Sequence, residues 1–314
     1  MMKILVTGIT GFLGSRLSEM LLDKSFDVIG SSRAGNASRN IFATGDIDGD
    51  TDWQEIVFGC DAVIHAAGRA HILNDNEKDI AAAFNKINCE ATIKLAEDAF
   101  AAGVKHFIFI SSIGVNGESM HQNAISEKSV PNPTSPYAIS KFNAERRLLE
   151  KYRNTQMAVT IIRPALICGP GAPGNINRLL KLVGSGLPLP FKKVNNLRSM
   201  ASLDNVCDFI IHCVNQPEAK DEVFVFSDEE ELSIEDITKL MSAGMGKKAR
   251  LFFFPSFLLK LLLTSIGRKK MYEQLFSSFS IDSTKSRALM KWKPVVTIQD
   301  TLFATGKAFH EGNR

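Results

Sequence analysis

Short apolar runs alternate with longer amphipathic stretches along the first half of the chain. Val, Ile, Leu and Phe fill most positions of these runs, as in parallel strands that are covered on both faces. They predict strands at residues 2–7, 26–31, 60–66, 104–111 and 158–163. The stretches between them predict helices at residues 14–24, 85–102 and 137–151. Strands and helices in alternation predict an α/β fold with a doubly wound parallel sheet.

The pattern changes after Pro164, where loops rich in glycine and proline surround short helices. One further strand is expected at residues 222–226, and the remainder of the chain has mixed character. We therefore expect two parts in one compact body, with a cleft between them. The larger part holds the sheet and comprises residues 1–165 and 202–227. The smaller, mixed part comprises residues 166–201 and 228–314.

Three glycines follow the first predicted strand at intervals of three residues and lead into the first helix. Glycine lets such a turn adopt unusual dihedral angles and lets the backbone approach a pyrophosphate. The N-terminus of the helix offers free N–H groups and the positive end of its dipole to phosphates. The motif predicts a Rossmann-type dinucleotide-binding domain, the alternative being a tight turn without a ligand. Its cofactor-binding residues would be Gly8, Thr10, Gly11, Phe12, Leu13 and Gly14.

The end of the second predicted strand indicates which dinucleotide binds. An acidic residue there would select NAD through the ribose hydroxyls, but the strand ends Ser31-Ser32-Arg33 without a carboxylate. Ser32 and Arg33 suit a 2′-phosphate, because Arg binds phosphate through a rigid two-donor fork. We expect NADP(H) to be preferred and NAD(H) to be possible; the alternative is that Arg33 is a solvated loop residue. The adenine and its ribose would lie against Asp46, Ile47, Ala66, Ala67 and Gly68. The alternative is that these are ordinary turn residues.

A tyrosine and a lysine, Tyr137 and Lys141, are four residues apart in a predicted helix and therefore share one face. A nearby ammonium lowers the pKa of a phenol toward neutrality, which would make Tyr137 a general acid or base. Ser112 follows a strand at its carboxyl end, where the active sites of α/β proteins collect, and can hydrogen-bond a reacting oxygen. Together with the early glycines, these residues predict an oxidoreductase-type site.

These motifs resemble those of the extended short-chain dehydrogenase/reductase family, which comprises nucleotide-sugar epimerases, dehydratases and reductases. The resemblance covers nearly the whole chain. Beside the glycines, Ser112 and the Tyr137/Lys141 pair, it includes the segments around Asn88, Arg163-Pro164, Gly169-Pro170-Gly171, Arg198, Leu203-Asp204-Asn205 and Trp292-Lys293-Pro294.

The resemblance implies that Ser112, Tyr137 and Lys141 are catalytic, and that Tyr137 and Lys141 also bind the cofactor with Asn88 and Pro164. It implies that a UDP-sugar binds against Ser112, Asn175 and Arg198, with Arg198 on the diphosphate. The alternative is that Asn175 is an ordinary loop amide and Arg198 a charge on the surface. A homodimer packed through the helices of Asn88 and Tyr137 is also implied.

Two departures from the family pattern narrow the reaction. Dehydratases of the family carry an Asp-Glu pair where this chain has Ile113-Gly114, so elimination of water is not expected. Asn116 replaces the usual tyrosine of a Val-Tyr-Gly segment. The sequence around Ser112 looks most like that of 4-keto reductases that make N-acetyl-quinovosamine or N-acetyl-fucosamine nucleotides.

Three hypotheses follow. The first is an NADPH-dependent reductase of a UDP-4-keto-6-deoxy-N-acetylhexosamine, serving surface polysaccharide synthesis. The second is a UDP-hexose 4-epimerase, for UDP-glucose or UDP-N-acetylglucosamine, with a retained NAD. The third is a non-catalytic dinucleotide sensor, against which the intact Ser112, Tyr137 and Lys141 argue. The absence of a carboxylate near Ser32 favours an exchangeable NADP(H) and thus the reductase.

Composition excludes other classes. The 314 residues are 45% hydrophobic and 23% charged with a net charge of +3, which is typical of a globular protein and too weakly basic for nucleic acid binding. Five cysteines without a Cys-x-x-Cys pair indicate neither a disulfide framework nor a metal site, and suit a cytoplasmic protein. No targeting segment is expected. The apolar stretch 251–266 is too short for an integral membrane span and predicts a helix packed on another domain or subunit. A membrane-surface patch is the alternative, although the stretch itself has no basic face.

Overall fold

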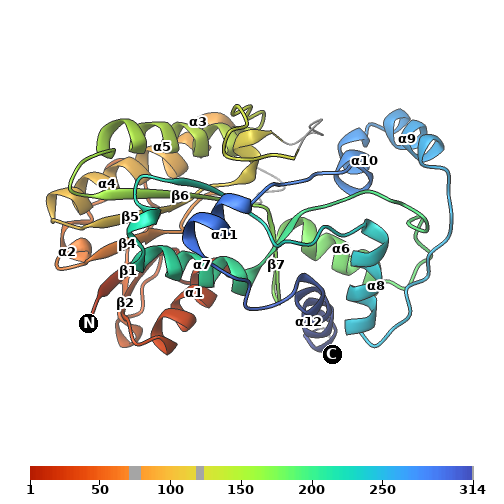
Figure 1. The fold of residues 1–314 in the computed structure, drawn as a ribbon, viewed down its shortest axis with the longest axis horizontal. Coiled ribbons are helices and arrows are strands. Elements are labelled where there is room, and N and C mark those ends of the chain that lie inside the picture. The colour runs from red at the N-terminus through yellow and green to blue at the C-terminus, as the bar shows by residue number, and fades with distance from the viewer. Residues whose placement is uncertain (71–78, 118–123, 313–314) are drawn as a thin grey trace.

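The computed structural model describes residues 1–70, 79–117 and 124–312 of the chain. Its centre is a seven-stranded parallel sheet in the order β3-β2-β1-β4-β5-β6-β9 (Figure 1). The strands are β1 (Lys3–Thr7), β2 (Asp27–Ser32), β3 (Ile41–Ala43), β4 (Ala62–His65), β5 (His106–Ile110), β6 (Ala158–Pro164) and β9 (Val223–Phe226). The predicted doubly wound α/β fold is confirmed. All carboxyl ends of the strands meet at one edge, because every pairing is parallel.

Helices cover both faces of the sheet. One face packs against α1 (Phe12–Asp23), α7 (Leu203–Asn215) and α11 (Thr284–Met290). The other packs against α2 (Gln54–Val57), α4 (Ala91–Ala101) and α5 (Pro136–Tyr152). The central strands are apolar at nearly every position because both of their faces are buried, as the sequence pattern predicts.

The helix expected at residues 85–102 has a different form. It begins earlier, as α3 (Ile80–Asn85), and continues through a π-helical turn (Lys86–Glu90) into α4. Such π turns commonly mark functional positions in helices, and this one carries the buried Asn88. Short 3-10 turns lie at Ala37–Arg39, Ile113–Asn116 and Pro217–Ala219.

A second lobe packs around its own hydrophobic core. It is built from β7 (Leu166–Cys168), β8 (Met200–Ser202), α6 (Gly174–Gly184), α8 (Ile234–Gly244) and α12 (Ile298–Glu311). Gly244 and Gly306 let α8 and α12 cross closely: a Cβ on Gly306 would lie 2.1 Å from the carbonyl oxygen of Met241. Phe12 packs against the cores of both lobes and joins them. The division at residues 165, 202 and 228 stays a prediction.

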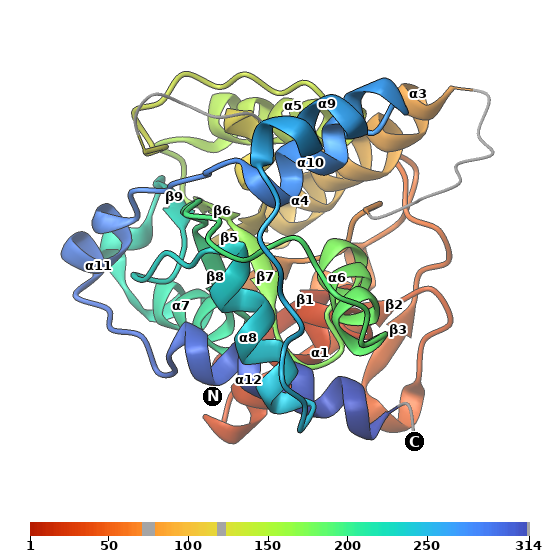
Figure 2. The ribbon, with the colours of Figure 1, turned by 90° about the vertical axis from the view of Figure 1, so that its right-hand side faces the viewer.

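Two helices of the second lobe, α9 (Ser256–Ser265) and α10 (Lys269–Phe276), lie at its outer end (Figures 1 and 2). We expected the apolar stretch 251–266 to pack on another domain or subunit. Within this chain α9 packs against α10, and of its side chains only Leu263 is buried. In the described part of the chain, no helix is both long and apolar enough to cross a membrane.

Candidate active site

The glycine motif forms a tight turn between β1 and α1. Gly8 has φ +67°, and a Cβ there would lie 2.9 Å from the backbone of Ala67. A Cβ on Gly14 would lie 2.2 Å from the carbonyl oxygen of Gly8, so neither position tolerates a side chain. Gly11 precedes α1 without a side-chain cap, which leaves the first N–H groups of the helix free for an anion. These features fit the pyrophosphate of a dinucleotide.

The predicted nucleotide-selecting residues lie at the exposed end of β2. The Arg33 side chain is 84% exposed, and its guanidinium lies 3.9 Å from the carboxylate of Asp46. The Ser32 hydroxyl accepts a hydrogen bond from the Gly35 N–H at 3.1 Å. Ile47 is half-buried and packs against the core of the sheet. Arg33 is therefore free to reorient toward a phosphate, since its only described ion pair is long and exposed.

Asn88 has a different environment from the one expected of a cofactor ligand. It is fully buried, and its amide oxygen accepts from the Arg69 N–H at 2.7 Å. Its amide nitrogen donates to the Arg69 carbonyl at 3.1 Å and to the Ser140 hydroxyl at 3.0 Å. A Cβ on Gly68 would lie 3.0 Å from Asn88 Oδ1 and 3.3 Å from Lys141 Nζ. Asn88 thus ties the turn after β4 to α5 and positions Gly68 beside Lys141.

Ser112 and Tyr137 are brought together at the carboxyl end of β5. Ser112 caps the 3-10 turn at Ile113–Asn116, and its hydroxyl accepts from the Gly114 N–H at 3.1 Å. Tyr137 begins α5, next to its cap Ser135, and its ring meets Phe84 edge-on at 6.1 Å between centroids. The Ser112 hydroxyl lies close enough to the Tyr137 hydroxyl to lower the pKa of the phenol. The two predicted hydroxyl groups therefore face the same point.

The pKa of Tyr137 shifts opposite to our expectation. Burial raises the pKa of Tyr137 above its ordinary value, and the hydrogen bond with Ser112 lowers it only in part. We expected Lys141 to bring this pKa toward neutrality. Desolvation of the phenolate is the largest cause of the shift, and Lys141 is not among the groups that move this pKa. Tyr137 is consequently protonated at neutral pH and suited to donate a proton.

Lys141 is held rigidly behind the two hydroxyl residues. Its side chain is 4% exposed, its ammonium donates to the Ile110 carbonyl at 2.9 Å, and it lies 4.6 Å from the centre of the Phe109 ring. Burial lowers the pKa of Lys141 to about 8, against the charge of Glu145, which raises it. A buried ammonium behind Ser112 and Tyr137 can hold the hydroxyls of a bound ribose or substrate.

A buried ion pair lies one helical turn beyond Lys141 and fixes this part of α5. Arg163 binds Glu145 through two nitrogens, at 2.9 Å from Nε to Oε1 and 2.5 Å from Nη2 to Oε2. Its third nitrogen donates to Asn116 Oδ1 at 3.0 Å. Glu145 lies one helical turn after Lys141 on α5. The Asn116 departure from the family pattern thus supplies a partner to Arg163, and Pro164 is buried at the end of β6.

The two residues expected in the sugar pocket lie in the second lobe. Arg198 is half-buried and donates to the Ser277 carbonyl at 2.9 Å, and burial lowers its pKa. Asn175, the second residue of α6, is exposed, and its oxygen accepts from Arg178 at 3.4 Å. Within the described part of the chain no carboxylate pairs with Arg198, so it can receive an anion.

A cavity of about 660 Å³ opens against the N-terminus of α1, between α1, α7, α12 and the loop after β7. It shares Thr10, Gly11 and Phe12 with the glycine turn and reaches Gly169 and Pro170 on the second lobe.

Sequence reasoning missed the Arg163–Glu145–Asn116 network and the contact between Asn88 and Arg69. Both join residues distant in the chain, and neither has a local motif.

Comparisons with known proteins agree with this geometry. A family model described as "NAD dependent epimerase/dehydratase family" matches residues 4–226. A UDP-glucose 4-epimerase of Vibrio cholerae is 32% identical over 99% of this chain and 96% of that protein. N-acetyl-alpha-D-glucosaminyl-diphospho-ditrans,octacis-undecaprenol 4-epimerase of Escherichia coli O157:H7 is 27% identical over 78% of this chain and 73% of its own length. The structure of UDP-glucuronic acid 4-epimerase from Bacillus cereus in complex with NAD shares the fold, with a TM-score of 0.78 and 23% identity over the whole of both chains.

Proposed function

The chain belongs to the NAD-dependent epimerase/dehydratase family, and from this premise we propose that it reduces the C4 keto group of a UDP-4-keto-6-deoxy-N-acetylhexosamine with NADPH. At the coarser level it is a nucleotide-sugar enzyme of the epimerase/dehydratase type. One observation carries the finer proposal. Strand β2 ends in the Ser32 hydroxyl and is followed by the exposed Arg33 guanidinium, and its end carries no carboxylate of its own for the ribose hydroxyls of NAD, although the Asp46 carboxylate lies 3.9 Å from Arg33.

The glycine turn and the uncapped start of α1 would hold the pyrophosphate of the cofactor, and Arg33 its 2′-phosphate. Tyr137 and Lys141 would hold the ribose next to the nicotinamide. When bound, the cofactor supplies a hydride for the sugar carbon. An exchangeable NADP(H) suits a reductase, because a reductase consumes one cofactor in each turnover, whereas an epimerase returns the hydride to the same sugar.

Ser112 and Tyr137 would hydrogen-bond the C4 oxygen from one side. The two hydroxyls lie close together, so both would be placed to stabilise the developing alkoxide. Tyr137 is protonated at neutral pH and would donate the proton that completes the alcohol. The Lys141 ammonium, fixed by the Ile110 carbonyl, would stabilise the tyrosinate that remains.

The second lobe would bind the nucleotide diphosphate. Arg198 supports this assignment, because its guanidinium is partly desolvated and bonded only to a carbonyl among the described residues. A bound anion would compensate the charge of this partly desolvated guanidinium. Asn175 lies at the start of α6 and would contact the sugar or the nucleotide. Ile113 and Gly114 occupy the positions next to Ser112, so we propose no elimination of water at this site.

A 4-epimerase acting on UDP-glucose or UDP-N-acetylglucosamine is the second candidate. It is favoured by the printed names of the two relatives and uses the same Ser112, Tyr137 and Lys141. It requires a cofactor that stays bound through oxidation and reduction of one sugar. We also propose a homodimer packed through α4 and α5, where Ile139 is 43% exposed on α5.

The test supplies the full-length protein with NADPH and a UDP-4-keto-6-deoxy-N-acetylhexosamine. The proposal expects one NADPH oxidised for each sugar and a 6-deoxy product with a C4 hydroxyl. Mass spectrometry of the dinucleotide that co-purifies should find NADP(H). Interconversion of UDP-glucose and UDP-galactose without added cofactor, and no NADPH oxidation with the keto sugar, would replace the reductase with the epimerase.

A further inference from the structure

Exposed apolar side chains are concentrated at one end of the second lobe. Eight of the twenty large hydrophobic residues that are exposed in the described part of the chain lie within residues 252–271. Phe257 is 64% exposed and Leu261, one helical turn later, is 66% exposed. We call this surface the α9–α10 patch: Phe252, Phe253, Phe257, Leu258, Leu261, Leu262, Ile266 and Met271. Large exposed apolar patches mark interaction sites.

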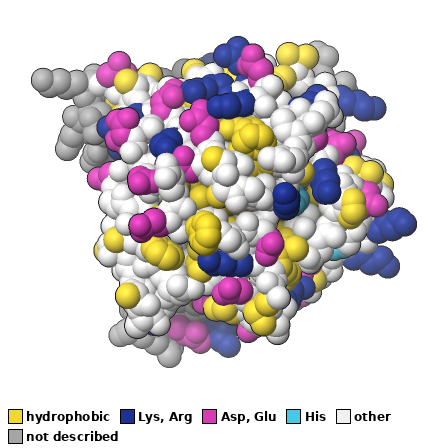
Figure 3. All heavy atoms as spheres, turned by 90° about the vertical axis from the view of Figure 1, so that its left-hand side faces the viewer, with side chains coloured by type: hydrophobic (Ala, Val, Ile, Leu, Met, Phe, Trp, Pro, Cys, Tyr) yellow, Lys and Arg dark blue, Asp and Glu magenta, His cyan; other side chains and the backbone are white. Residues whose placement is uncertain are grey.

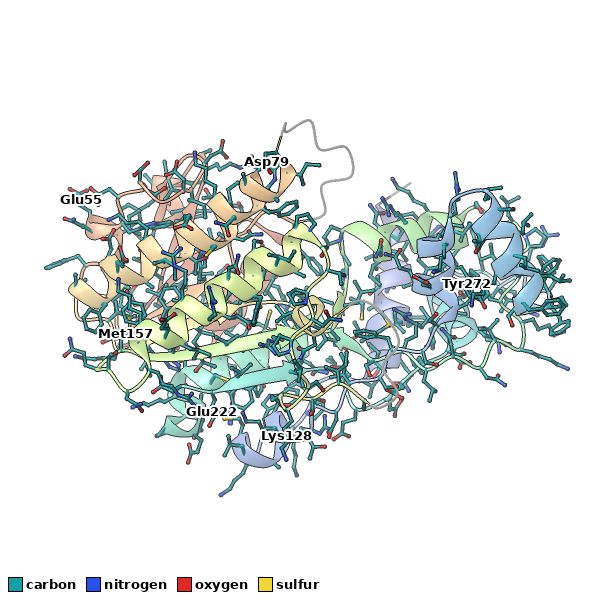
Figure 4. The ribbon with its side chains drawn as sticks, turned by 90° about the horizontal axis from the view of Figure 1, so that it is seen from above. Glu55, Asp79, Lys128, Met157, Glu222 and Tyr272 are labelled. Atoms are coloured by element: carbon teal, nitrogen blue, oxygen red, sulfur yellow. The ribbon has the colours of Figure 1, made fainter. Side chains whose placement is uncertain are left out.

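The chain itself does not cover this patch. Helix α9 has a polar stripe of Ser256, Lys260 and Thr264 and is otherwise apolar, yet its Leu263 alone is buried, and its packing partner is α10. A helix with one polar stripe normally turns its apolar face toward the core. Seen from above, Tyr272 on α10 lies at the opposite end of the molecule from Met157 and Glu55 in the sheet domain (Figure 4). The patch therefore faces outward at a free end.

The length of α9 determines how it could meet a membrane. Ten residues rise about 15 Å, roughly half the hydrocarbon thickness of a bilayer. Such a helix cannot span, but it can lie in the interface with its apolar side chains among the lipids. Lys260, in the middle of α9, is exposed and can extend its ammonium to the headgroups.

The charge around the patch is strongly basic. Residues 245–276 contain seven Lys and Arg and one acidic residue, a net charge of +6, whereas the whole chain carries +3. The remainder of the molecule is therefore acidic, at −3. The backbone of Phe252 also pairs with Lys192, which brings a further basic side chain to this edge. At the opposite end of the molecule, basic and acidic side chains are intermixed (Figure 3).

This charge argues against a second copy of the chain as the occupant. A symmetric dimer through the α9–α10 patch would place two basic rims against each other. The single acid of the segment, Glu273, is already 3.6 Å from Lys269. An anionic lipid surface complements both the apolar patch and its basic rim.

We propose that the α9–α10 patch docks this protein on the surface of an anionic lipid bilayer. Apolar side chains of α9 enter the interface, and basic residues such as Arg268 and Lys269 contact the headgroups. Helix α10 leads directly to Ser277, whose carbonyl accepts from Arg198 at 2.9 Å. Docking therefore holds the second lobe and its anion-accepting arginine close to the membrane surface. The docking itself does not depend on the proposed reaction.

The experiment is flotation of the full-length protein with vesicles of phosphatidylcholine alone or mixed with phosphatidylglycerol. We expect binding to the anionic vesicles, weaker binding to the neutral ones, and release at high salt. The double substitution Phe257→Ser, Leu261→Ser should weaken binding by about tenfold or more through lost apolar burial. Arg268→Gln with Lys269→Gln should weaken it by roughly tenfold and flatten the salt dependence.

Phe58→Ser is the matched control, because Phe58 is 75% exposed in the sheet domain, outside the patch. It should leave flotation unchanged, and all variants should keep wild-type turnover of a water-soluble UDP-sugar. Failure of the wild type to float with either vesicle overturns docking and leaves the proposed reaction unaffected. A wild-type dimer that becomes a monomer in Phe257→Ser, Leu261→Ser, measured by light scattering without lipid, also overturns it and assigns the patch to a second copy.

Discussion

The two sides of the candidate site are built in different ways. On the sheet side, Lys141 and Asn88 are buried. The Lys141 ammonium and the Asn88 amide both make hydrogen bonds within the fold. On the side of the second lobe, Arg198 is half-buried with one carbonyl partner and Asn175 is exposed. The sheet side is therefore set before substrate binds, as catalysis requires. The second lobe leaves polar groups available, and these are the groups that decide which substrate binds.

The largest effect expected from this comparison is on the sheet side, at Tyr137. Tyr137→Phe removes only the hydroxyl, so folding should persist and cofactor binding should weaken only slightly, because Lys141 still holds the ribose, while turnover falls by roughly two to four orders of magnitude. Tyr152→Phe is the matched control, because the Tyr152 hydroxyl is buried without a partner among the described residues. Steady-state kinetics measure both. Near-normal turnover of Tyr137→Phe would move the proton donor elsewhere and restore the sensor hypothesis.

A second prediction concerns the buried support of that side. Glu145→Gln leaves Arg163 without its charged partner and should destabilise the fold by about 3–5 kcal/mol. Denaturant unfolding measures this change. Glu150→Gln, on the exposed face of the same helix, should change stability very little. Equal effects of the two substitutions would mean that the ion pair does not hold α5 in place.

The third prediction separates the two cofactors. Arg33→Ala should weaken NADP(H) by about tenfold to a hundredfold and leave NAD(H) nearly unchanged, since only the 2′-phosphate contact is lost. Titration of both dinucleotides gives the ratio. Arg39→Ala removes another exposed arginine and should not alter it. A wild type that prefers NAD(H) would contradict the assignment of Arg33.

The fourth and smallest effect is a pH dependence. The pKa of Lys141 is lowered to about 8 by burial, so its charge in the folded protein is lost as pH rises through 8. If the ammonium holds the cofactor, affinity should fall by about tenfold between pH 7 and pH 9. Lys141→Met should bind more weakly and remove this transition. Because the pKa of Lys141 is lower in the folded than in the unfolded state, its deprotonation above pH 8 raises the free energy of unfolding, so this group does not itself favour unfolding there.

The fold was predictable from the sequence where apolar runs are local and continuous. The five strands expected in the first half match five strands of the sheet within a few residues, and the turn at Gly8 has the positive φ that its glycine suggests. The short β3, β7 and β8 were missed because three residues carry too little pattern. They form because distant segments meet, as at Leu166 and Met200.

The candidate site was predictable in its residues more than in its energetics. The spacing of Tyr137 and Lys141 correctly placed both on α5, beside Ser112. The direction of the Tyr137 pKa shift was wrong, because spacing does not reveal how much water a phenol loses. The exposure of α9 was likewise hidden, since an apolar run looks the same in sequence whether it is covered by protein or not.

The central claim is hydride transfer from an exchangeable NADPH to C4 of a keto sugar. It is tested most directly with NADPH that carries deuterium at its transferable position, incubated with the enzyme and a UDP-4-keto-6-deoxy-N-acetylhexosamine. The account predicts one deuterium at C4 of each new product molecule and its absence in Tyr137→Phe. A product without deuterium, or the interconversion of C4 epimers of a UDP-hexose with no label incorporated, would contradict it.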